Sequence, residues 1–199
     1  MLRGLGGVTQ GIMAMSTAAA GAKGREALAQ GDLRAVAAAY DAHHTRVRAF
    51  ARRLLGDVDA AEEVVQDVFV ALPKALGRYR GDAPIASFLL GITAKRCAKA
   101  RRARVRRERA YRGLAREPDP TGPPDPEREA GRRRQAEALA RALDALPMKQ
   151  RTVFVLMAVE EHTSPEVADM LGVPEGTVRT RLMHARRKLR ASLAKEGLR

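Results

Sequence analysis

The chain has 199 residues and a formal net charge of +14 at pH 7, because 37 Lys and Arg residues outnumber 23 Asp and Glu residues. Such an excess favours a polyanionic partner, nucleic acid before membrane, with a generically basic protein as the alternative. The single cysteine, Cys97, excludes an internal disulfide and a multi-cysteine zinc site. We expect no metal and no cofactor, since no metal-ligand spacing links the four histidines, His43, His44, His162 and His184.

Residues 1–31 are rich in Gly and Ala, and we expect a flexible tail there. They loosely resemble an export signal, but glycines at positions 4, 6, 7 and 11 interrupt the apolar stretch. A start codon placed too far upstream is the alternative explanation, since Met13 and Met15 follow. No apolar run approaches the roughly 18 residues of a membrane span, so we expect no membrane insertion and a cytoplasmic protein.

Two amphipathic helices are predicted after the tail. Asp32 is a plausible N-cap for the first, whose apolar stripe comprises Val36, Tyr40, Val47, Phe50 and Leu54. Gly56 should end it, with Asp57 or Asp59 capping the next helix. That second helix has an apolar face made of Ala61, Val65, Val68, Phe69 and Leu72. Its opposite face is polar and mostly acidic, with Glu62, Glu63, Gln66 and Asp67.

Pro73 should end or kink the second helix near Ala71, because proline removes a hydrogen-bond donor and clashes with the preceding turn. Residues 77–84 contain two glycines, an Asp and a Pro, which is typical of a loop. A third helix is predicted to begin near Pro84, since proline is favoured in a first turn. Its continuation to residue 112 is almost entirely basic, with Glu108 as its one acid.

Residues 116–129 hold five prolines and five acids, a composition expected of a linker rather than of a helix or core. Helix should resume from about residue 132 and break at 146–150, where Pro147 would begin a new helix. No strand-like alternation is long enough to indicate a sheet. We therefore predict an all-α protein with two small helical domains, divided as tail 1–31, first domain 32–112, linker 113–131 and second domain 132–199.

The stretch SPEVADMLGVPEGTVRTRL, residues 164–182, has the spacing of a helix-turn-helix. Ser164 would cap the first helix, with Pro165 at its first position. Ala168 offers a small side chain where the two helices cross, and Gly172 permits the reversal of the backbone. The second helix would turn inward the apolar residues Val178, Leu182, Ala185 and Leu189.

The outward face of the second helix is predicted to contact DNA through Glu175, Thr177, Arg179, Thr180, Arg181, His184, Arg186 and Arg187. Arginine can pair with guanine edges in the major groove, while threonine and other arginines can hold phosphates. The alternative is that a small helical domain simply ends in a basic amphipathic helix. The order of small residue, glycine, turn and basic helix favours DNA binding.

Two sets of motifs resemble the extracytoplasmic-function (ECF) sigma factors of bacterial RNA polymerase, over about residues 32–194. The segment ALDALPMKQRTVFVLMAVEEHTSPEVADMLGVPEGTVRTRLMHARRKLR (142–190) is similar to region 4 of that family. The segment ARRLLGDVDAAEEVVQDVFVAL (51–72) is similar to its regions 2.1 and 2.2, and RYRGDAPIASFLLGI (78–92) to regions 2.3 and 2.4. Both sets occur in the right order and flank the linker.

The resemblance implies a division of roles. The acidic face at Glu62, Glu63, Gln66 and Asp67, which alone could be an ordinary solvated helix side, would dock on the clamp of the largest polymerase subunit. A basic groove and a pocket for an extruded base would hold the melted −10 strand through Tyr79, Arg80, Asp82, Phe88, Lys95, Arg96 and Lys99. The second domain would read the −35 element as duplex. Core polymerase and promoter DNA are the implied partners, and an anti-sigma factor is left open.

Some positions depart from the family's pattern. Phe88 stands where the family usually has Trp, so stacking on a base would be retained. Ala94, Lys95 and Lys99 align with its usual Arg-Asn pair and Asp, which implies an altered promoter preference or weaker melting. Pro73 replaces an aliphatic or aromatic residue and would reshape the clamp contact.

Two other functions fit parts of the sequence. A free-standing helix-turn-helix regulator would bind duplex DNA without polymerase, but it needs neither the acidic face nor the YRGDAP loop. A metal-dependent nuclease would use Asp57, Asp59 and Glu62, yet capping and the helix dipole explain these carboxylates equally well, and no His or Lys partner accompanies them. We therefore predict a promoter-recognition subunit of RNA polymerase with no catalytic residues.

Overall fold

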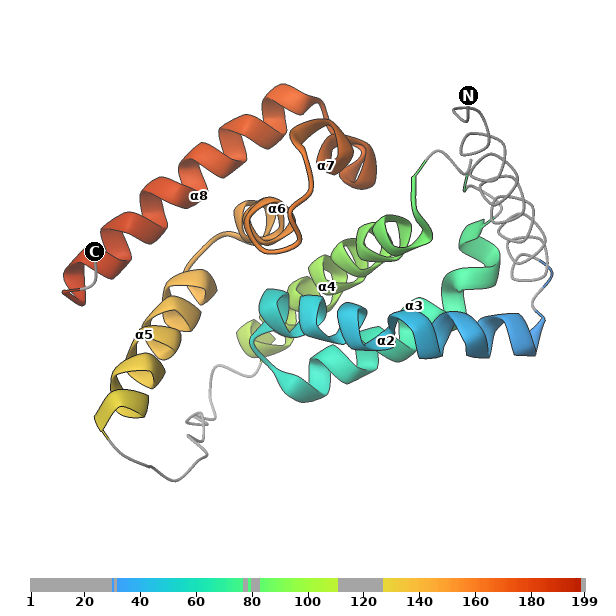
Figure 1. The fold of residues 1–199 in the computed structure, drawn as a ribbon, viewed down its shortest axis with the longest axis horizontal. Helices are drawn as coiled ribbons and strands as arrows, with labels where there is room; N and C mark the ends of the chain where they lie inside the picture. The colour runs from blue at the N-terminus through green and yellow to red at the C-terminus, as the bar shows by residue number, and fades with distance from the viewer. Residues whose placement is uncertain (1–29, 31, 77–78, 80–82, 111–126, 198–199) are drawn as a thin grey trace, which may run out of the picture.

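The structure is a computed structural model that describes residues 30, 32–76, 79, 83–110 and 127–197, without the side chains of 108–110 and 127–134. Within these residues the chain forms seven helices and no strand, which confirms the all-α prediction (Figure 1). The helices are α2 (Leu33–Leu55), α3 (Val58–Leu76), α4 (Ile85–Ala110), α5 (Glu127–Asp144), α6 (Met148–Ala158), α7 (Ser164–Leu171) and α8 (Glu175–Lys195).

Helices α2, α3 and α4 pack on one another and form what we term the N-terminal unit. The apolar stripes predicted for α2 and α3 face its interior, where Phe50 and Leu72 are fully buried together with Leu89 of α4. Each buried side chain of this size contributes about 1.5–3 kcal/mol by leaving water. The amphipathic pattern of the sequence is thus sufficient to explain why these three helices associate.

The caps of α2 and α3 also follow the prediction. Asp32 accepts a hydrogen bond from the backbone N–H of Arg34 at 2.9 Å. Gly56 ends α2 in the left-handed region with a φ of 68°, a conformation that side chains with Cβ rarely adopt. Of the two candidate caps for α3, Asp57 accepts from the backbone N–H of Ala60 at 3.0 Å.

Two predicted helix bounds have different outcomes. Helix α3 continues through Pro73 to Leu76, so the proline does not end it; in Figure 1 its last turns run in a different direction from the rest. Helix α5 begins at Glu127, inside the linker predicted for residues 113–131. The last of the five prolines is Pro126, and the sequence after it is rich in Glu, Arg, Gln and Ala, which favour helix.

Helices α5 to α8 form the C-terminal unit, in which α8 contacts α5, α6 and α7. A small apolar cluster joins α5 to the far half of α8 through Ala142, Leu146, Ala185 and Leu189. Helix α6 begins directly after Pro147, as predicted. Phe154 of α6 packs both against this cluster and against the main core.

The two units pack on each other, an arrangement that the sequence did not predict. The main buried cluster continues from α2, α3 and α4 into α6, α7 and α8, and Figure 1 shows α4 between the other N-terminal helices and the C-terminal unit. Arg151 of α6, with only 3% of its side chain exposed, donates from Nε to the carbonyl oxygen of Arg53 at 2.6 Å and pairs with Asp144. Burial lowers the pKa of Arg151, and the neighbouring Asp144 opposes that shift.

A second polar contact closes the same interface. The carboxylate of Glu160, 8% exposed, lies 2.8 Å from Nε of Arg46 and 3.6 Å from a terminal nitrogen of Arg53. Residues Arg53 and Arg151 are 98 positions apart in the chain. The α2 helix is therefore tied to both ends of α6 by charged groups, beside the apolar contact of the two units.

Candidate nucleic-acid interface

The first helix of the predicted helix-turn-helix is α7, and its cap differs from the prediction. Thr163, not Ser164, is the N-cap, because the carboxylate of Glu166 accepts from its backbone N–H at 2.7 Å and from its Oγ1 at 2.8 Å. Pro165 is consequently the second helical residue rather than the first. These two hydrogen bonds are the main reason why the pKa of Glu166 lies below its ordinary value.

The turn between α7 and α8 has the predicted form. Gly172 has a φ of 66°, and the N–H of Val173 reaches back to the carbonyl oxygen of Ala168 at 3.0 Å, which closes the end of α7. Ala168 is buried at the crossing, while Val178 and Leu182 seal α8 from the inner side. The helix-turn-helix is therefore formed as the spacing of small, glycine and apolar residues predicts.

The eight predicted DNA-contacting residues all lie on α8, and several are engaged with one another. Arg179 pairs with Glu175 at 2.6 Å. Thr180 donates to the carbonyl oxygen of Gly176, and Arg187 lies 3.3 Å from the ring of His184. Thr177 and Arg186 are also exposed or half-exposed, whereas Arg181 differs from the prediction, because it lies toward α4 rather than outward.

One residue of this face was missed by the sequence analysis. Met183 is 58% exposed, although an apolar side chain of its size gains nothing from facing water. Its position next to the inward Leu182 was the signal that could have identified it. An exposed apolar group on a recognition helix can contact a thymine methyl group.

The acidic face on α3 is only partly free. Glu62 is half-buried and pairs with Arg48 at 2.7 Å, and Asp67 lies 3.2 Å from Arg96 of α4. Glu63 and Gln66 are exposed and have no side-chain partner among the described residues. The structure thus brings the four predicted residues together on one side of α3, with Glu63 and Gln66 the most available.

The same face includes an apolar residue that the sequence analysis missed. Val70 is 80% exposed, and it lies seven residues after Glu63, two turns further along the helix. Helical periodicity places Val70 on the polar side of α3, and an apolar residue on that side could have been recognised from the sequence. Exposed apolar surface beside charged groups is common at protein-protein contacts.

The predicted −10 residues are distributed over a loop and α4, and Arg80 and Asp82 lie outside the described residues. Tyr79 donates from its hydroxyl to the carbonyl oxygen of Ala83, and its ring centroid lies 4.8 Å from that of Phe88. Both rings also pack against the core. The predicted stacking position at Phe88 is therefore already in contact with a protein aromatic ring.

The basic residues of α4 point in different directions. Arg96 faces α3, where it pairs with Asp67, while Lys95 and Lys99 are exposed. Ala94 is 4% exposed, so this departure from the family's pattern is a buried position. Residues of α4 that lie toward the C-terminal unit line a cavity that is open to solvent and has a volume of about 1050 Å³.

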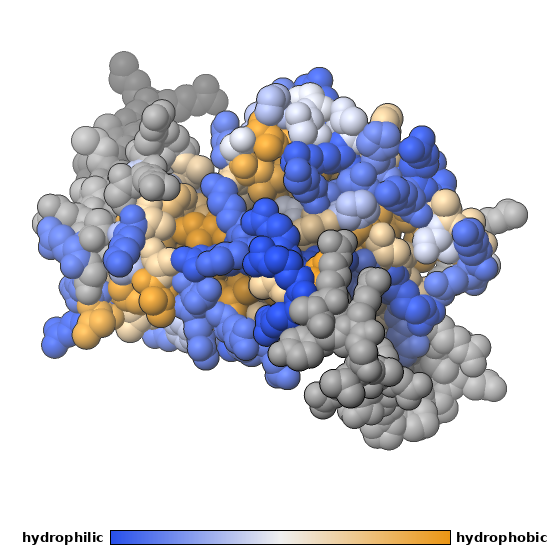
Figure 2. Space-filling view, turned by 180° about the vertical axis from the view of Figure 1, so that it is seen from behind, coloured by the Kyte–Doolittle hydropathy of each residue, from blue (hydrophilic) through white to orange (hydrophobic). Residues whose placement is uncertain are grey.

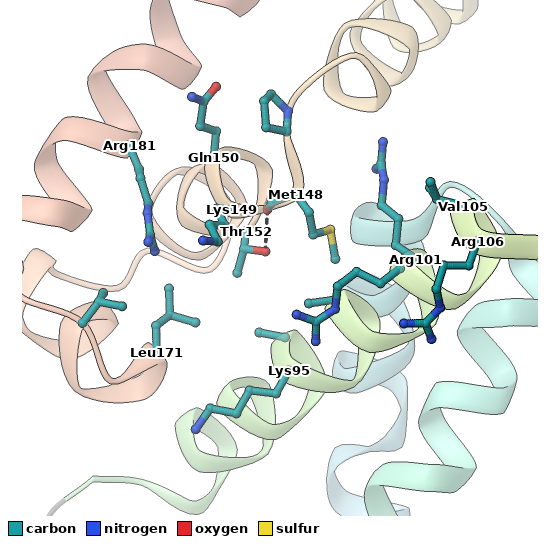
Figure 3. Close-up of a pocket in the computed structure, with 15 residues that line it drawn as sticks. Lys95, Arg101, Val105, Arg106, Met148, Lys149, Gln150, Thr152, Leu171 and Arg181 are labelled. Carbon is teal, nitrogen blue, oxygen red and sulfur yellow. Dashed lines mark hydrogen bonds between the residues drawn. The ribbon is translucent and has the colours of Figure 1, made fainter. Parts of the chain in front are cut away.

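That cavity lies between α4 and the helix-turn-helix (Figure 3). In Figure 3, Lys95, Arg101 and Arg106 extend from α4 on one side, and Lys149 and Arg181 lie on the opposite side, on α6 and α8. The apolar side chains of Met148, Leu171 and Val173 contribute to its wall. The interface thus brings residues of both predicted DNA-reading helices to one cavity.

Family comparisons agree with the two-part organisation of this geometry. The family model described as Sigma-70 region 2 matches residues 39–107, and the one described as Sigma-70, region 4 matches residues 136–189. The chain is 32% identical over 151 residues to the ECF RNA polymerase sigma factor SigM of Mycobacterium tuberculosis (strain Erdman), covering 74% of this chain and 71% of SigM. The chain belongs to the ECF RNA polymerase sigma factors.

One further relative and two solved structures are also similar to this sigma factor. SigE of Mycolicibacterium smegmatis is 33% identical over 157 residues, which cover 78% of this chain and 60% of SigE. The solved structure of CnrH in complex with the cytosolic domain of CnrY matches with a TM-score of 0.60 and 26% identity, over 86% of this chain and 96% of CnrH. Sigma factor RpoE of Bartonella quintana, at 23% identity and a TM-score of 0.58, covers 76% of this chain and 91% of its own and supports the fold.

As a sigma factor, the protein binds core RNA polymerase and directs promoter-specific transcription initiation, and sigma factors are non-enzymatic regulators. Two of the three carboxylates that could suggest a nuclease have structural partners: Asp57 caps α3 and pairs with Arg104 at 3.1 Å, and Glu62 pairs with Arg48. The third, Asp59, lies in the first turn of α3, where a negative charge suits the helix dipole. No cluster of potential metal ligands occurs among the described residues, and none of the described helices is long and apolar enough to cross a membrane.

Proposed function

We propose that this sigma factor docks on the polymerase clamp through one side of α3 and grips the upstream promoter element through α8. The observation that carries the proposal is the opposite character of two exposed helix faces on one chain. Glu63 and Gln66 expose polar groups without partners among the described residues, whereas α8 exposes Arg179, Arg186 and Arg187. An acidic face repels DNA and can instead bind a protein surface, whereas a basic face attracts phosphates and base edges.

We further propose that Val70 belongs to the docking face. Its side chain is 80% exposed beside Glu63 and Gln66, so contact with the polymerase would remove apolar surface from water. The ion pairs of Glu62 and Asp67 with arginines of the same chain make these two residues weaker contributors, because their charges are already partly compensated.

For the −35 element, we propose that α8 enters the major groove with its first turns. Arg179 would release Glu175 to reach a base or a phosphate, while Arg186 and Arg187 on later turns would hold the backbone. Met183 would add an apolar contact on the same face. This assignment predicts base readout near the start of α8 and charge-dominated binding toward its end.

For the −10 element, we propose that the exposed Lys95 and Lys99 hold phosphates of the melted strand, along with Arg96. Phe88 packs on Tyr79, so a base would stack on this pair from its outer side or displace Tyr79. Loop residues Arg80 and Asp82 remain predicted contributors. The protein would act in the cytoplasm. An anti-sigma partner is proposed because RpoE, which has a similar fold, was solved in complex with the anti-sigma factor NepR.

The docking assignment is tested with the double variant Glu63→Arg, Asp67→Arg. Pull-down of core polymerase should be abolished, because two positive charges would face the site that accepts the acidic helix, while affinity for −35 duplex should be unchanged. The control is Asp41→Arg on α2, an exposed carboxylate outside this face. Unchanged core binding by the double variant would refute the assignment.

The −35 assignment is tested by measuring Arg179→Ala and Arg181→Ala on a panel of duplexes with single base changes. A residue that reads a base should lose about 1–3 kcal/mol of discrimination at one position. Loss of a phosphate contact would instead weaken binding equally across the panel.

In-vitro transcription with core polymerase on genomic fragments then identifies the promoter. A protein that binds duplexes without supporting initiation would act as a free-standing regulator.

A further inference from the structure

The cavity between α4 and the C-terminal unit has an unusual distribution of charge. Its lining contains no carboxylate, and it includes six cationic side chains, namely Lys95, Arg101, Arg102, Arg106, Lys149 and Arg181. None of the six forms an ion pair with another described residue, and Arg101 alone donates a hydrogen bond, to the carbonyl oxygen of Asp144 at 3.2 Å. Like charges facing one another across a cavity repel, so the closed packing of the two units carries an electrostatic cost.

The cavity also adjoins the positive end of a helix. Pro147, Met148, Lys149 and Gln150 all line it, and they form the cap and the first turn of the 11-residue helix α6. The unpaired N–H groups of a first helical turn favour an anion nearby. Both the side chains and the backbone of this wall therefore favour negative charge in the same place.

The dimensions and the wall chemistry suit a small ligand rather than a duplex. A volume of about 1050 Å³ is just above the range for small-molecule pockets, roughly 300–1,000 Å³. Met148, Leu171 and Val173 give an apolar wall beside the cations. Oε1 of Gln150 is buried and has no hydrogen-bond donor among the described residues, so a ligand hydroxyl or amino group would satisfy it.

We propose that this cavity binds a compact polyphosphate, either inorganic or the phosphate chain of a nucleotide. The chain would bridge Lys95, Arg101 and Arg106 of α4 to Lys149 and Arg181 of the C-terminal unit (Figure 3). Because these groups meet only when the two units are packed together, the ligand binds the closed arrangement. It thereby opposes promoter binding, which rests on the proposed function of α4 and α8.

The physical link is competition for the same cations. Lys95 and Arg181 are proposed to contact promoter DNA, and in the closed arrangement both line the cavity instead. A ligand that binds only the closed form reduces the fraction of protein free to open, by a factor that rises with ligand concentration over its dissociation constant. DNA must weaken ligand binding by the same factor.

Isothermal titration of the full chain at constant ionic strength provides the test, with inorganic tripolyphosphate, ATP, GTP and AMP as probes. Tripolyphosphate should bind, and AMP should bind at least about tenfold more weakly, since its single phosphate offers fewer charged oxygens to the cations. Tighter binding of ATP or GTP than of tripolyphosphate would assign the apolar wall and Gln150 to a nucleoside. Equal binding would assign the site to inorganic polyphosphate. Absence of binding by all four would overturn the proposal.

The variants separate this site from general positive charge. Arg106→Ala with Lys149→Ala removes two cavity cations that are not assigned to promoter or polymerase contact, and tripolyphosphate binding should fall at least about tenfold. Lys188→Ala with Arg190→Ala removes the same charge from exposed positions of α8 and should leave binding unchanged. Equal losses in both double variants would mean nonspecific attraction and would overturn the proposal.

Promoter affinity provides the second readout. Saturating tripolyphosphate should weaken binding of −35 duplex to the wild-type chain, and have little effect on the Arg106→Ala, Lys149→Ala variant at the same ionic strength. If tripolyphosphate binds but affects the duplex affinity of both proteins equally, the proposal that ligand and DNA compete would be overturned. Core polymerase pull-down from the same samples distinguishes a failure of the docking assignment, because neither cavity residue lies on the α3 face.

Discussion

The interior of the N-terminal unit and its interface with the C-terminal unit are built from different interactions. In the interior, helices α2, α3 and α4 meet through fully buried apolar residues such as Phe50, Leu54 and Leu72. At the interface, apolar contact is supplemented by the buried groups of Arg151 and Glu160, which pair with partly exposed residues. Opening the interface would expose the apolar residues that continue the core into α6 and α7, whereas its charged groups can exchange protein partners for water or DNA. The charged contacts are therefore the part of the interface that a partner can replace most readily.

The surface shows the same contrast. Figure 2 shows a band of hydrophilic residues across the middle of the face opposite to Figure 1, with apolar surface visible beside it. Exposed large apolar residues include Val70 and Met183, which lie on the two faces proposed to meet polymerase and DNA. Apolar residues are also exposed elsewhere, for example Leu33 at 83% and Val58 at 51%, so the assignment of the two faces rests on their charged neighbours as well.

The largest expected effect comes from breaking the interior. Phe50→Ala should lower the free energy of unfolding by about 3–5 kcal/mol, because it removes a fully buried ring and leaves a cavity. Val70→Ala, at an 80% exposed position, is the control and should change it by less than about 0.5 kcal/mol. Urea unfolding followed by circular dichroism measures both. Similar values for the two variants would contradict the assignment of the core.

Opening the interface should have a smaller effect of a different kind. Glu160→Ala leaves Arg46 and Arg53, which are 44% and 42% exposed, to be solvated by water. We expect closure to weaken by about 1–3 kcal/mol, as for hydrogen bonds to charged groups, while helix content stays constant. The radius of gyration from small-angle X-ray scattering should increase. An unchanged radius, or the same increase in the control Asp41→Ala, would show that Glu160 does not hold the units together.

The single cysteine offers an independent report on this opening. Burial raises the pKa of Cys97 to about 12, and the nearby Arg151 opposes that shift. The thiol is fully buried and protonated at neutral pH, so reaction with a thiol reagent should be slow in the wild-type chain. Faster reaction in Glu160→Ala than in Asp41→Ala would sharpen the conclusion that the interface opens without unfolding.

The substitution Gly91→Ala should have opposite effects on the stability of α4 and on its contact with α7. Gly91→Ala favours helix α4 by up to about 1 kcal/mol, because glycine is the weaker helix former. The added Cβ would lie 3.0 Å from the backbone carbonyl oxygen of Met170, a contact that requires α7 to give by a few tenths of an ångström. Gly176→Ala adds a Cβ in open space and is the matched control. Urea unfolding should therefore show a smaller gain of stability for Gly91→Ala than for Gly176→Ala.

The contrast between interior and interface also explains what could be predicted from sequence. Asp32, Gly56 and Gly172 were identified because caps and left-handed turns depend on a few adjacent residues. The buried stripes were identified because helical periodicity is local. The pair of Arg53 and Arg151 could not be, since its members lie 98 residues apart and nothing in either segment specifies the other.

Two local features show how far neighbouring residues specify a helix. Thr163, not Ser164, caps α7, because Glu166, three residues after Thr163, forms the pattern of a capping box. Of the two outcomes predicted at Pro73, an end or a kink, α3 shows the kink, since it continues to Leu76 with a change of direction (Figure 1). At the site, the DNA-facing side of α8 followed from periodicity, while the cavity required the tertiary arrangement.

The smallest expected effect lies at the cap of α7. The hydrogen bonds from Thr163 lower the pKa of Glu166 below its ordinary 4.5, so the carboxylate stabilises the fold while it is ionised. This contribution is complete above pH 4.5 and is lost as the pH falls through the lower pKa of the folded state. Glu166→Ala should therefore be less stable than the wild type at pH 7, and the difference in stability should narrow at acid pH.

The same cap shows whether α7 depends on the closed interface, because α7 contacts α4. The titration of the Thr163 amide can be followed by NMR in the wild type and in Glu160→Ala. An equal titration midpoint in both would mean that α7 keeps its own cap when the units separate, as a helix-turn-helix that acts in the open form requires.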